Sequence, residues 1–250
     1  MTYDISILVP ATSHKRNYNS FKDTDLYIYL FKSFFSTYDK EHNYTIYLGI
    51  DQDDKFYHNV DVQNDIKKFI SVMINTKIKI IDFNFNYKGN PCAIWTSLYY
   101  LAYHTTSNYF VQVGSDIMFL DKHWINCAIQ KLKDNDDLGV VGLADQGRKE
   151  YNPKDSLFTQ TIVSRKHLEI FGFYFPPEIK NWGCDNWIGD IYDKNNLKHY
   201  IYQRIYNCGG EPRYDVPLDF KDQYYNAMEK HKNKIKLYFD MKLDNQFLCY

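Results

Sequence analysis

The sequence predicts an α/β fold with a mixed, mainly parallel β-sheet and helices on both faces. In the first half of the chain, short apolar runs alternate with longer segments in which apolar residues recur at helical spacing. Such β-α-β alternation is typical of parallel sheets that helices cover on both sides. The length of 250 residues suits one large domain, and a hydrophobic content of 44% is enough to build its core.

The first half of the chain shows this alternation most clearly. Its first strand is an apolar run that ends at Pro10, and its first helix repeats apolar residues at Leu26, Leu30 and Phe34. A polar, glycine-containing loop from Asn84 to Pro91 precedes the third helix. The predicted strands of this half are 5–9, 44–50, 78–81 and 109–113, and the predicted helices are 23–38, 60–74 and 92–104.

The pattern becomes less regular after the fourth strand. Ser164 is a candidate N-cap for a short helix, and Pro176-Pro177 interrupts the chain after it. No internal repeat or low-complexity linker divides the sequence, so we expect residues 1–250 to form a single domain. The remaining predicted strands are 138–143 and 157–163, and the remaining predicted helices are 124–133, 164–171, 185–192 and 222–238.

Composition excludes several classes of protein. A formal net charge of -1 argues against electrostatic binding to nucleic acid, which needs a strong basic excess. The five cysteines are odd in number and lack a CxxC spacing, which favours reduced thiols over a disulfide framework or a zinc site. No apolar run approaches the ~20 residues that span a bilayer, and the N-terminus lacks a secretion-signal pattern, so we expect a cytoplasmic protein without a transmembrane segment.

Gly114-Ser115-Asp116 is the most informative motif. It directly follows the fourth predicted strand, so it places a carboxylate at the carboxyl edge of the sheet, where open α/β sheets bind ligands. Mg²⁺ or Mn²⁺ takes oxygen ligands and often uses only one or two protein carboxylates beside phosphates and water. Asp116 can therefore serve as a metal ligand, with the Ser115 hydroxyl or Asp121 in support. The alternative is that Asp116 caps a turn.

Two further segments have the chemistry of a nucleotide site. Asp51 and Asp53 follow the second strand, where carboxylates can accept hydrogen bonds from a base or ribose, although a solvated acidic turn has the same composition. Lys88 precedes a helix N-terminus that favours phosphate, although a polar connection would look alike. The turn after the first strand, Pro10 to His14, contains no glycine, and this argues against a Rossmann dinucleotide site.

The later segments suit a sugar acceptor. Asp185 lies between Trp182 and Trp187, and aromatic rings around one carboxylate suit a sugar, with the carboxylate as general base on its hydroxyl. An N-capping aspartate between two core tryptophans is the alternative. Asp145 follows a strand and can either reach an acceptor hydroxyl or cap a turn. His199 or His231 can complete a metal site, but a lone histidine is more often a packing residue.

Taken together, these positions resemble the GT-A class of glycosyltransferases, in particular the short family-2-like enzymes of large DNA viruses and bacteria. The resemblance covers roughly residues 4 to 195 and depends on the order and spacing of its motifs. These motifs are Ile5 to Pro10, Gly49 to Asp54, Lys88 to Asn90, Gly114 to Asp116 and Trp182 to Trp187. The family fold is the nucleotide-diphospho-sugar transferase fold, a Rossmann-like α/β sheet.

The resemblance implies a transfer reaction and a division of the chain. The donor would be a nucleotide-diphosphate sugar, often UDP-linked, with Mn²⁺ or Mg²⁺, and the acceptor would be a carbohydrate or glycoprotein, in the host cytoplasm if the protein is viral. Residues 1–120 would form the nucleotide-sugar-binding half, 121–215 the acceptor-binding half, and 216–250 a C-terminal helical extension.

The resemblance also implies roles for individual residues. Asp116 matches the last aspartate of the family's DxD metal motif, and Asp185 matches the catalytic base of inverting members. Two departures stand out: Gly114 replaces the first DxD aspartate, and Cys184 stands where an acidic residue often precedes the base. The residues implied to contact the nucleotide sugar are Pro10, Thr12, Arg16, Asp51, Asp53, Lys88, Ser115 and Asp116.

Two other functions remain open at this point. A nucleotidyltransferase on a similar sheet would need a glycine-rich basic loop after the first strand, and here only His14-Lys15-Arg16 follows it, without glycine. A non-catalytic glycan-binding or scaffolding descendant would account for the incomplete DxD motif.

Overall fold

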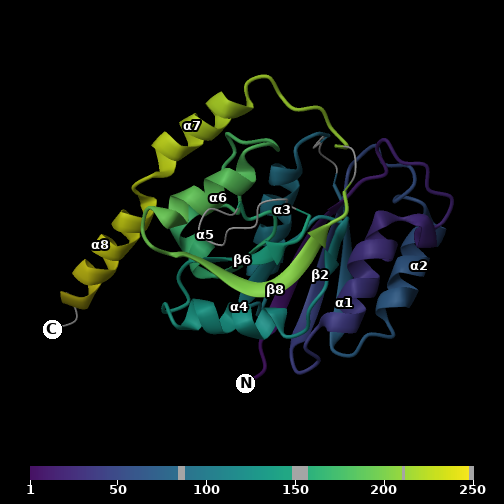
Figure 1. Ribbon diagram of the computed structural model, residues 1–250, viewed down its shortest axis with the longest axis horizontal. Coiled ribbons are helices and arrows are strands. Elements are labelled where there is room, and N and C mark those ends of the chain that lie inside the picture. The colour runs from purple at the N-terminus through teal and green to yellow at the C-terminus, as the bar shows by residue number, and fades with distance from the viewer. Residues whose placement is uncertain (84–87, 148–156, 210–211, 248–250) are drawn as a thin grey trace.

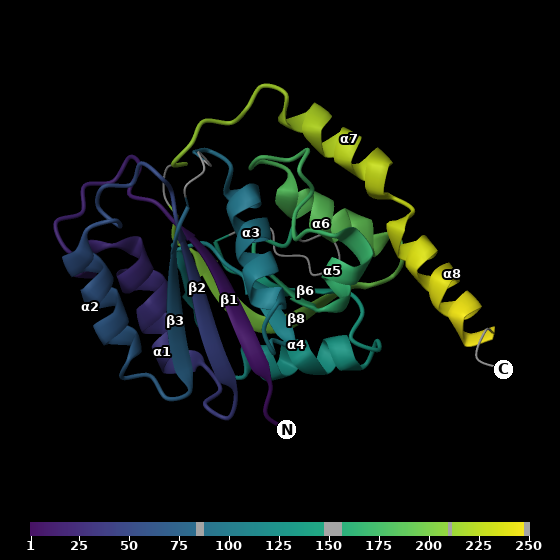
Figure 2. The ribbon, with the colours of Figure 1, turned by 180° about the vertical axis from the view of Figure 1, so that it is seen from behind.

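The computed structural model describes residues 1–83, 88–147, 157–209 and 212–247 and contains one eight-stranded sheet. The strand order is β3-β2-β1-β4-β7-β6-β8-β5, and β1 pairs in parallel with both β2 and β4 (Figure 1, Figure 2). The strands are β1 (Asp4–Ala11), β2 (Asn43–Ile50), β3 (Thr76–Asp82), β4 (Tyr109–Gln112), β5 (Ile117–Phe119), β6 (Val140–Asp145), β7 (Thr161–Ser164) and β8 (Lys198–Asn207).

The sheet is mixed, as the sequence predicts. The first four strands in space are mutually parallel, whereas β7 runs antiparallel to both β4 and β6. β8 returns parallel to β6 and pairs antiparallel with the short β5. Figure 1 shows β8 as a long bent strand that crosses the front of the molecule. The parallel strands bring the ends of β1, β2 and β4 to one edge.

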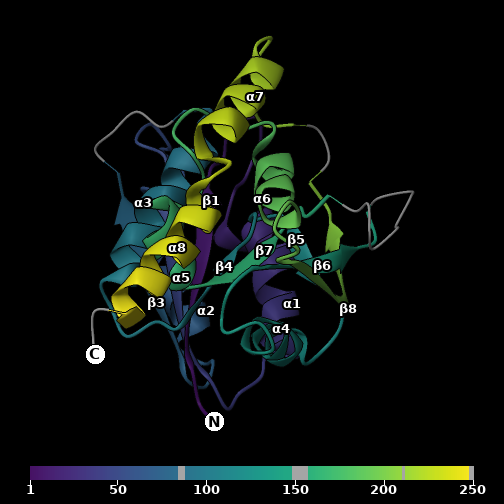
Figure 3. The ribbon, with the colours of Figure 1, turned by 90° about the vertical axis from the view of Figure 1, so that its left-hand side faces the viewer.

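Helices cover both faces of the sheet. On β1, Ile5, Ile7 and Val9 pack into one apolar cluster, whereas Leu8 packs into the other. α1 (Lys32–Thr37), α2 (Val60–Ile70) and α4 (Trp124–Lys133) contribute to the first cluster. α3 (Pro91–Tyr103), α5 (Lys166–Phe171), α6 (Cys184–Asp193) and α7 (Phe220–His231) contribute to the second. Figure 3 shows α3 on one side of β1, with α1 and α4 on the other.

The structure differs from the sequence prediction in several elements. The predicted helix 23–38 consists of a 3-10 turn (Phe21–Asp23), a π-helix (Leu26–Phe31) and α1. The predicted helix 222–238 consists of α7 and α8 (Lys234–Phe247), which extend along one side of the molecule (Figure 1). Among the described residues, no helix combines the length and apolar character that a membrane span requires.

Two strands escape the sequence prediction for physical reasons. β8 has only Ile201 and Ile205 buried among polar and exposed aromatic residues, so its apolar periodicity is weak. β5 contains three residues, which is too short for a recognisable apolar run. β7 begins at Thr161, so the first residues of the predicted strand 157–163 are not strand.

Candidate functional site

Two adjoining cavities lie at the carboxyl ends of β1, β2 and β4. The larger has a volume of ≈ 290 Å³ and the smaller ≈ 140 Å³, and both include Thr12 and Tyr214 in their walls. Other residues around the larger cavity include Pro10, Ser115, Asp116, Trp182 and Arg213. Other residues around the smaller cavity include His14, Asp51, Asp53 and Lys88. The sheet edge therefore gathers most of the predicted site residues around one continuous region.

Asp51 is the buried carboxylate of the smaller cavity. It follows the last residue of β2 and is 7% exposed. The Tyr214 hydroxyl donates to Asp51 Oδ2 at 2.7 Å, whereas the buried Oδ1 has no hydrogen-bond partner in the described part of the chain. Burial raises the pKa of this carboxyl above its ordinary value, although the hydrogen bond from Tyr214 opposes the shift. The site thus holds an acceptor oxygen that requires a donor.

The rest of the smaller cavity is polar and aromatic. Asp53 and Lys88 are exposed in its wall, and their contact with a nucleotide stays a prediction. The His14 ring stacks on Tyr214, with ring centroids 4.9 Å apart and an interplanar angle of 11°. Asp54 stabilises the turn after β1 by accepting hydrogen bonds from the Ser13 backbone N–H and, at 2.9 Å, from the Ser13 hydroxyl.

The Gly114-Ser115-Asp116 motif forms part of the larger cavity. Ser115 is buried, and its Oγ accepts a hydrogen bond of 2.8 Å from Arg213 Nη1. Asp116 remains partly exposed, and its Oδ2 lies 3.8 Å from Arg213 Nη2. Both residues are therefore in the predicted place, but each contacts a guanidinium that the sequence analysis did not identify.

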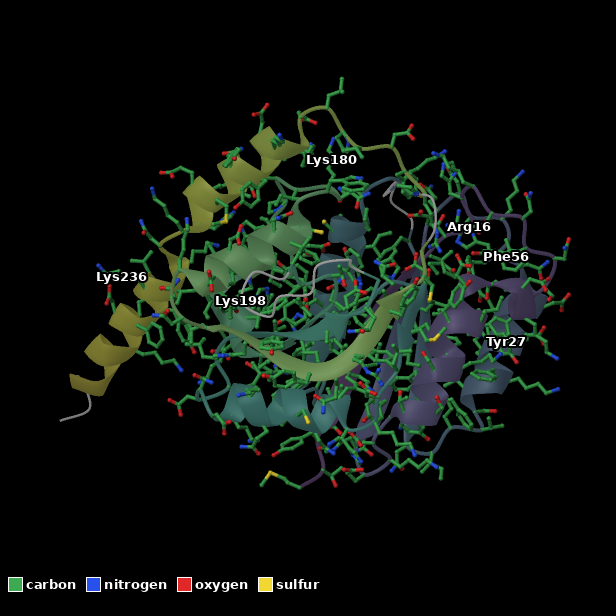
Figure 4. The ribbon with its side chains drawn as sticks, in the orientation of Figure 1. Arg16, Tyr27, Phe56, Lys180, Lys198 and Lys236 are labelled. Carbon is green, nitrogen blue, oxygen red and sulfur yellow. The ribbon has the colours of Figure 1, made fainter. Side chains whose placement is uncertain are left out.

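Arg213 comes from the linker between β8 and α7. Its Nη2 donates to Asp25 Oδ2 at 2.7 Å, and Arg16 Nε lies 3.3 Å from the same oxygen. Figure 4 places Arg16 beside this linker, where its Nη2 donates to Gly209 O at 2.9 Å. Burial opposes charge on Arg213, yet Asp116 and Asp25 raise the pKa of its guanidinium. Asp25, Arg213 and Tyr214 are thus site residues that sequence analysis missed.

Among the described residues, the surroundings of Asp116 supply few ligands for a divalent cation. Gly114 supplies no side-chain ligand, and no group of three His, Cys, Asp or Glu side chains suited to a metal ion occurs within residues 1–83, 88–147, 157–209 and 212–247. Asp121 is instead bound by Arg204, whose Nη2 lies 2.8 Å from Asp121 Oδ1. We therefore assign no step of the reaction to Mn²⁺ or Mg²⁺.

The two histidines proposed to complete a metal site lie among other groups. His231 contacts Glu178, with Nε2 3.2 Å from Oε2, and packs against the ring of Phe173. His199 lies on β8 opposite Val141, and burial lowers the pKa of its ring. Neither belongs to a group of three metal-binding side chains among the described residues, and the contacts of both favour the packing alternative.

The predicted acceptor residues separate into surface and core positions. Trp182 is 37% exposed and lies in the wall of the larger cavity, and its contact with an acceptor stays a prediction. Trp187 is fully buried against Phe171 and Phe173, so the prediction that it contacts an acceptor is wrong. The sequence pattern did not distinguish the two tryptophans because both flank the same helix start.

Asp145 is a structural carboxylate. It is 3% exposed, and its oxygens accept hydrogen bonds from the Gly147 and Asn207 backbone N–H groups and, at 2.8 Å, from the Thr159 hydroxyl. These bonds hold the end of β6 against the end of β8. The prediction that Asp145 reaches an acceptor hydroxyl is therefore wrong.

Asp185 lies in the first turn of α6, half-buried, beside the residues that border the larger cavity. The Cys184 thiol donates to its Oδ1 at 3.4 Å. A hydrogen bond with Cys92, together with burial, raises the pKa of the Cys184 thiol, so the thiol remains protonated as a donor. Asp185 thus follows Trp182 by three residues and does not line the larger cavity itself, and its role as a base stays a prediction.

Comparison with known proteins supports the fold. No family model matches the chain, and no curated protein matches it. The crystal structure of S. aureus TarS 1-349 matches with a TM-score of 0.59 and 14% identity, over 93% of this chain and 65% of that one. Its complex with UDP-GlcNAc matches with a TM-score of 0.59 and 16% identity, over 88% and 64% of the two chains.

A third structure, the same protein in complex with UDP, matches with a TM-score of 0.57 and 15% identity, over 90% of this chain and 63% of that one. The chain thus spans about 65% of the length of the TarS chain that it matches. At this identity the likeness shows the fold, and it confirms the predicted α/β fold class with its mixed sheet.

Proposed function

We propose that this protein is a GT-A glycosyltransferase that uses a nucleotide-diphosphate sugar, with UDP as the nucleotide. The main support is the pair of adjoining cavities, one with a buried acceptor oxygen on Asp51 and the other with a guanidinium on Arg213. This pair suits a ligand with a donor-rich base at one end and a diphosphate next to it. The similarity in fold to TarS, which has been crystallised with UDP-GlcNAc and with UDP, supports the same proposal.

The smaller cavity would bind the nucleoside. Asp51 Oδ1 has no hydrogen-bond partner among the described residues and would accept an N–H from the base, while Asp53 would accept a ribose hydroxyl. Lys88 would approach the diphosphate from the start of α3. Pro10 and Thr12, at the end of β1, would border the nucleotide where the two cavities meet.

The larger cavity would bind the sugar and its acceptor. An acceptor hydroxyl oxygen attacks the anomeric carbon, the bond from that carbon to the diphosphate oxygen breaks, and the nucleoside diphosphate leaves with the electron pair. The hydroxyl proton passes to Asp185, and the configuration at the anomeric carbon inverts. Trp182 would pack against a carbohydrate or glycoprotein acceptor.

A donor screen with a matched pair of variants tests this proposal. The purified protein is incubated with UDP- and GDP-sugars, and release of nucleoside diphosphate is measured with and without candidate glycan acceptors. Asp185→Asn should keep donor binding and lose about 100-fold or more of transfer, because a general base contributes about that much. Asp193→Asn, an exposed aspartate on the same helix, is the control and should retain transfer.

Two results would contradict the proposal in different ways. Full transfer by Asp185→Asn would remove the assignment of the base but leave the transferase. Donor binding without hydrolysis or transfer under any condition would instead favour a glycan-binding or scaffolding protein on this fold.

A further inference from the structure

We infer that Arg213, held in place by Asp25 and supported by Arg16, is the cation that binds the donor diphosphate in this protein, and that donor binding needs no divalent metal. This inference rests on the proposed function, since it specifies how that site holds its ligand. It concerns the position next to Asp116, where the GT-A resemblance implies a metal.

The contacts of Arg213 set its guanidinium in the larger cavity. The side chain is 14% exposed, with Nη1 on Ser115 Oγ at 2.8 Å and Nη2 on Asp25 Oδ2 at 2.7 Å. Its Nε–H is buried and finds no acceptor in the described structure. A buried N–H without an acceptor is costly, and a phosphate oxygen is an acceptor that arginine binds well. The guanidinium is therefore fixed in place with bonding capacity left over.

The charges around Asp116 disfavour a divalent cation. Two guanidiniums, Arg16 and Arg213, face two carboxylates, Asp25 and Asp116, so these four side chains sum to no net charge. Asp116 Oδ2 already lies 3.8 Å from Arg213 Nη2. A metal ion on that oxygen would sit beside a fixed positive charge in a partly buried site, where like charges repel strongly.

The ligand count leads to the same conclusion. Mg²⁺ and Mn²⁺ take oxygen ligands, and Mg²⁺ demands near-octahedral geometry. Gly114 removes one carboxylate of the family motif, and Ser115 is already bonded to Arg213. Arg213 thus occupies, in charge and in position, the place that a metal would take.

The sharpest test is whether removing the Asp116 carboxylate weakens or strengthens UDP binding. If Asp116 holds a metal, Asp116→Asn abolishes metal-dependent nucleotide binding. If Arg213 holds the diphosphate, Asp116 competes with phosphate for the guanidinium, so Asp116→Asn should bind UDP as tightly as the parent protein or several-fold more tightly. Isothermal calorimetry with UDP, and with GDP in parallel, measures this directly in buffer containing EDTA and then with Mn²⁺ added.

Arginine variants provide the second arm. Arg213→Gln removes the charge and should weaken UDP binding about 10-fold or more, whereas Arg213→Lys keeps the charge and should lose less. Arg204→Gln is the matched control, because Arg204 is an exposed arginine that binds Asp121 away from the cavity. It should bind UDP like the parent protein. Circular dichroism of each variant checks that the fold is retained.

The calorimetry distinguishes Arg213 from a divalent metal ion as the positive charge that binds the diphosphate. Binding that is unchanged by EDTA, weakened by Arg213→Gln and kept by Asp116→Asn supports the inference. Binding that appears only with Mn²⁺ and disappears in Asp116→Asn overturns it while leaving the proposed transferase intact. Absence of UDP and GDP binding under every condition would count against the proposed function itself, and the inference would fall with it.

Discussion

Asp51 carries a buried carboxylate whose environment is unfavourable in the free protein. Its Oδ1 is buried without a hydrogen-bond partner among the described residues, and such an atom typically costs about 1–3 kcal/mol. Burial raises the pKa of the carboxyl, so the neutral form is more favourable in the folded protein than in the unfolded chain. A bound base with an N–H group would relieve this cost, so the strain at Asp51 is consistent with a ligand site.

Asp51→Asn should therefore stabilise the free protein at neutral pH and weaken UDP binding. Because the pKa is raised in the folded state, the Asp51 contribution to stability is highest below the ordinary aspartate pKa and falls as the pH rises through the raised value. The melting temperature of the variant should exceed that of the parent at pH 7, and the difference should shrink toward pH 4. Thermal unfolding across this pH range measures it.

The control for this prediction is Asp65→Asn, an exposed aspartate on α2. It should change neither the melting temperature nor UDP binding. A pH-independent loss of stability in Asp51→Asn would show that the carboxylate is needed for its hydrogen bond with Tyr214 and that its burial is not costly.

At the scale of elements, the contact between β2 and α3 depends on Gly49. A Cβ at this position would lie 2.7 Å from Ile94 Cγ2 and 2.8 Å from Phe83 Cε2, closer than side-chain atoms normally approach. The absence of a side chain thus lets α3 pack directly against the strand that leads to Asp51. The site geometry depends on this close packing.

Gly49→Ala should destabilise the protein by about 1–3 kcal/mol, the usual cost of overfilling a packed core. Chemical denaturation gives the free energy of unfolding. Gly189→Ala is the matched control, because a Cβ there would meet Lys198 at an ordinary 3.5 Å and alanine favours the helix α6. Opposite signs for the two variants are expected, and equal destabilisation would contradict the argument from close packing.

The helix α5 contains a buried histidine, His167, that should make the stability of the protein depend on pH. His167 Nδ1 lies 2.8 Å from the Tyr192 hydroxyl and Nε2 lies 2.9 Å from Tyr174 O, so the neutral ring satisfies both nitrogens. Burial lowers the pKa of His167 to about 4. The unfolded chain, with an ordinary pKa near 6.5, takes up a proton more readily than the folded one.

Stability should consequently fall as the pH drops from about 6.5 to 4, by up to roughly 3 kcal/mol from this residue. His167→Gln should flatten that part of the pH profile, whatever its effect on stability at pH 7. Urea denaturation at several pH values measures the slope. His104→Gln, at an exposed position, should leave the slope as in the parent protein, and an unchanged slope in His167→Gln would refute the prediction.

A site residue can be predicted from the sequence when it follows a strand with a clear apolar pattern, and not when the strand before it has a weak one. Asp51 and Asp116 follow apolar parallel strands, and the ends of such strands meet at one edge, so both were placed correctly. Arg213 and Tyr214 follow β8. Because the apolar pattern of β8 is weak, the sequence did not predict this strand and could not place the residues that come after it. Trp182 and Trp187 have the same sequence context, and only packing decides which one is exposed.

At the scale of the whole molecule, the linker after β8 joins the two predicted halves. Arg213 bonds Asp25, Tyr214 bonds Asp51, and Lys15 Nζ lies 3.0 Å from Asp215 Oδ1. The predicted division at residue 120 thus describes the order of the chain, while both cavities are built from residues on either side of it. A ligand in these cavities should therefore raise the stability of both predicted halves together, and not of residues 1–120 alone.

Tyr214 allows this coupling to be measured. Tyr214→Phe keeps the ring against His14 but removes the donor to Asp51, and Tyr214→Ala removes both. We expect the parent protein to gain about 2.7 kcal/mol of stability at UDP concentrations 100 times the dissociation constant. At the same UDP concentration, Tyr214→Phe should show a smaller thermal shift and Tyr214→Ala the smallest.

The control is Tyr225→Phe, at an exposed tyrosine on α7, which should match the parent protein with and without UDP. Equal UDP shifts in the parent and both Tyr214 variants would mean that the linker closes the fold without taking part in the site. A graded loss would instead show that the segment after β8 belongs to the nucleotide site. In that case ligand binding strengthens the contact between the linker and the N-terminal strands. Binding at the sheet edge would then raise the free energy of unfolding of the whole molecule.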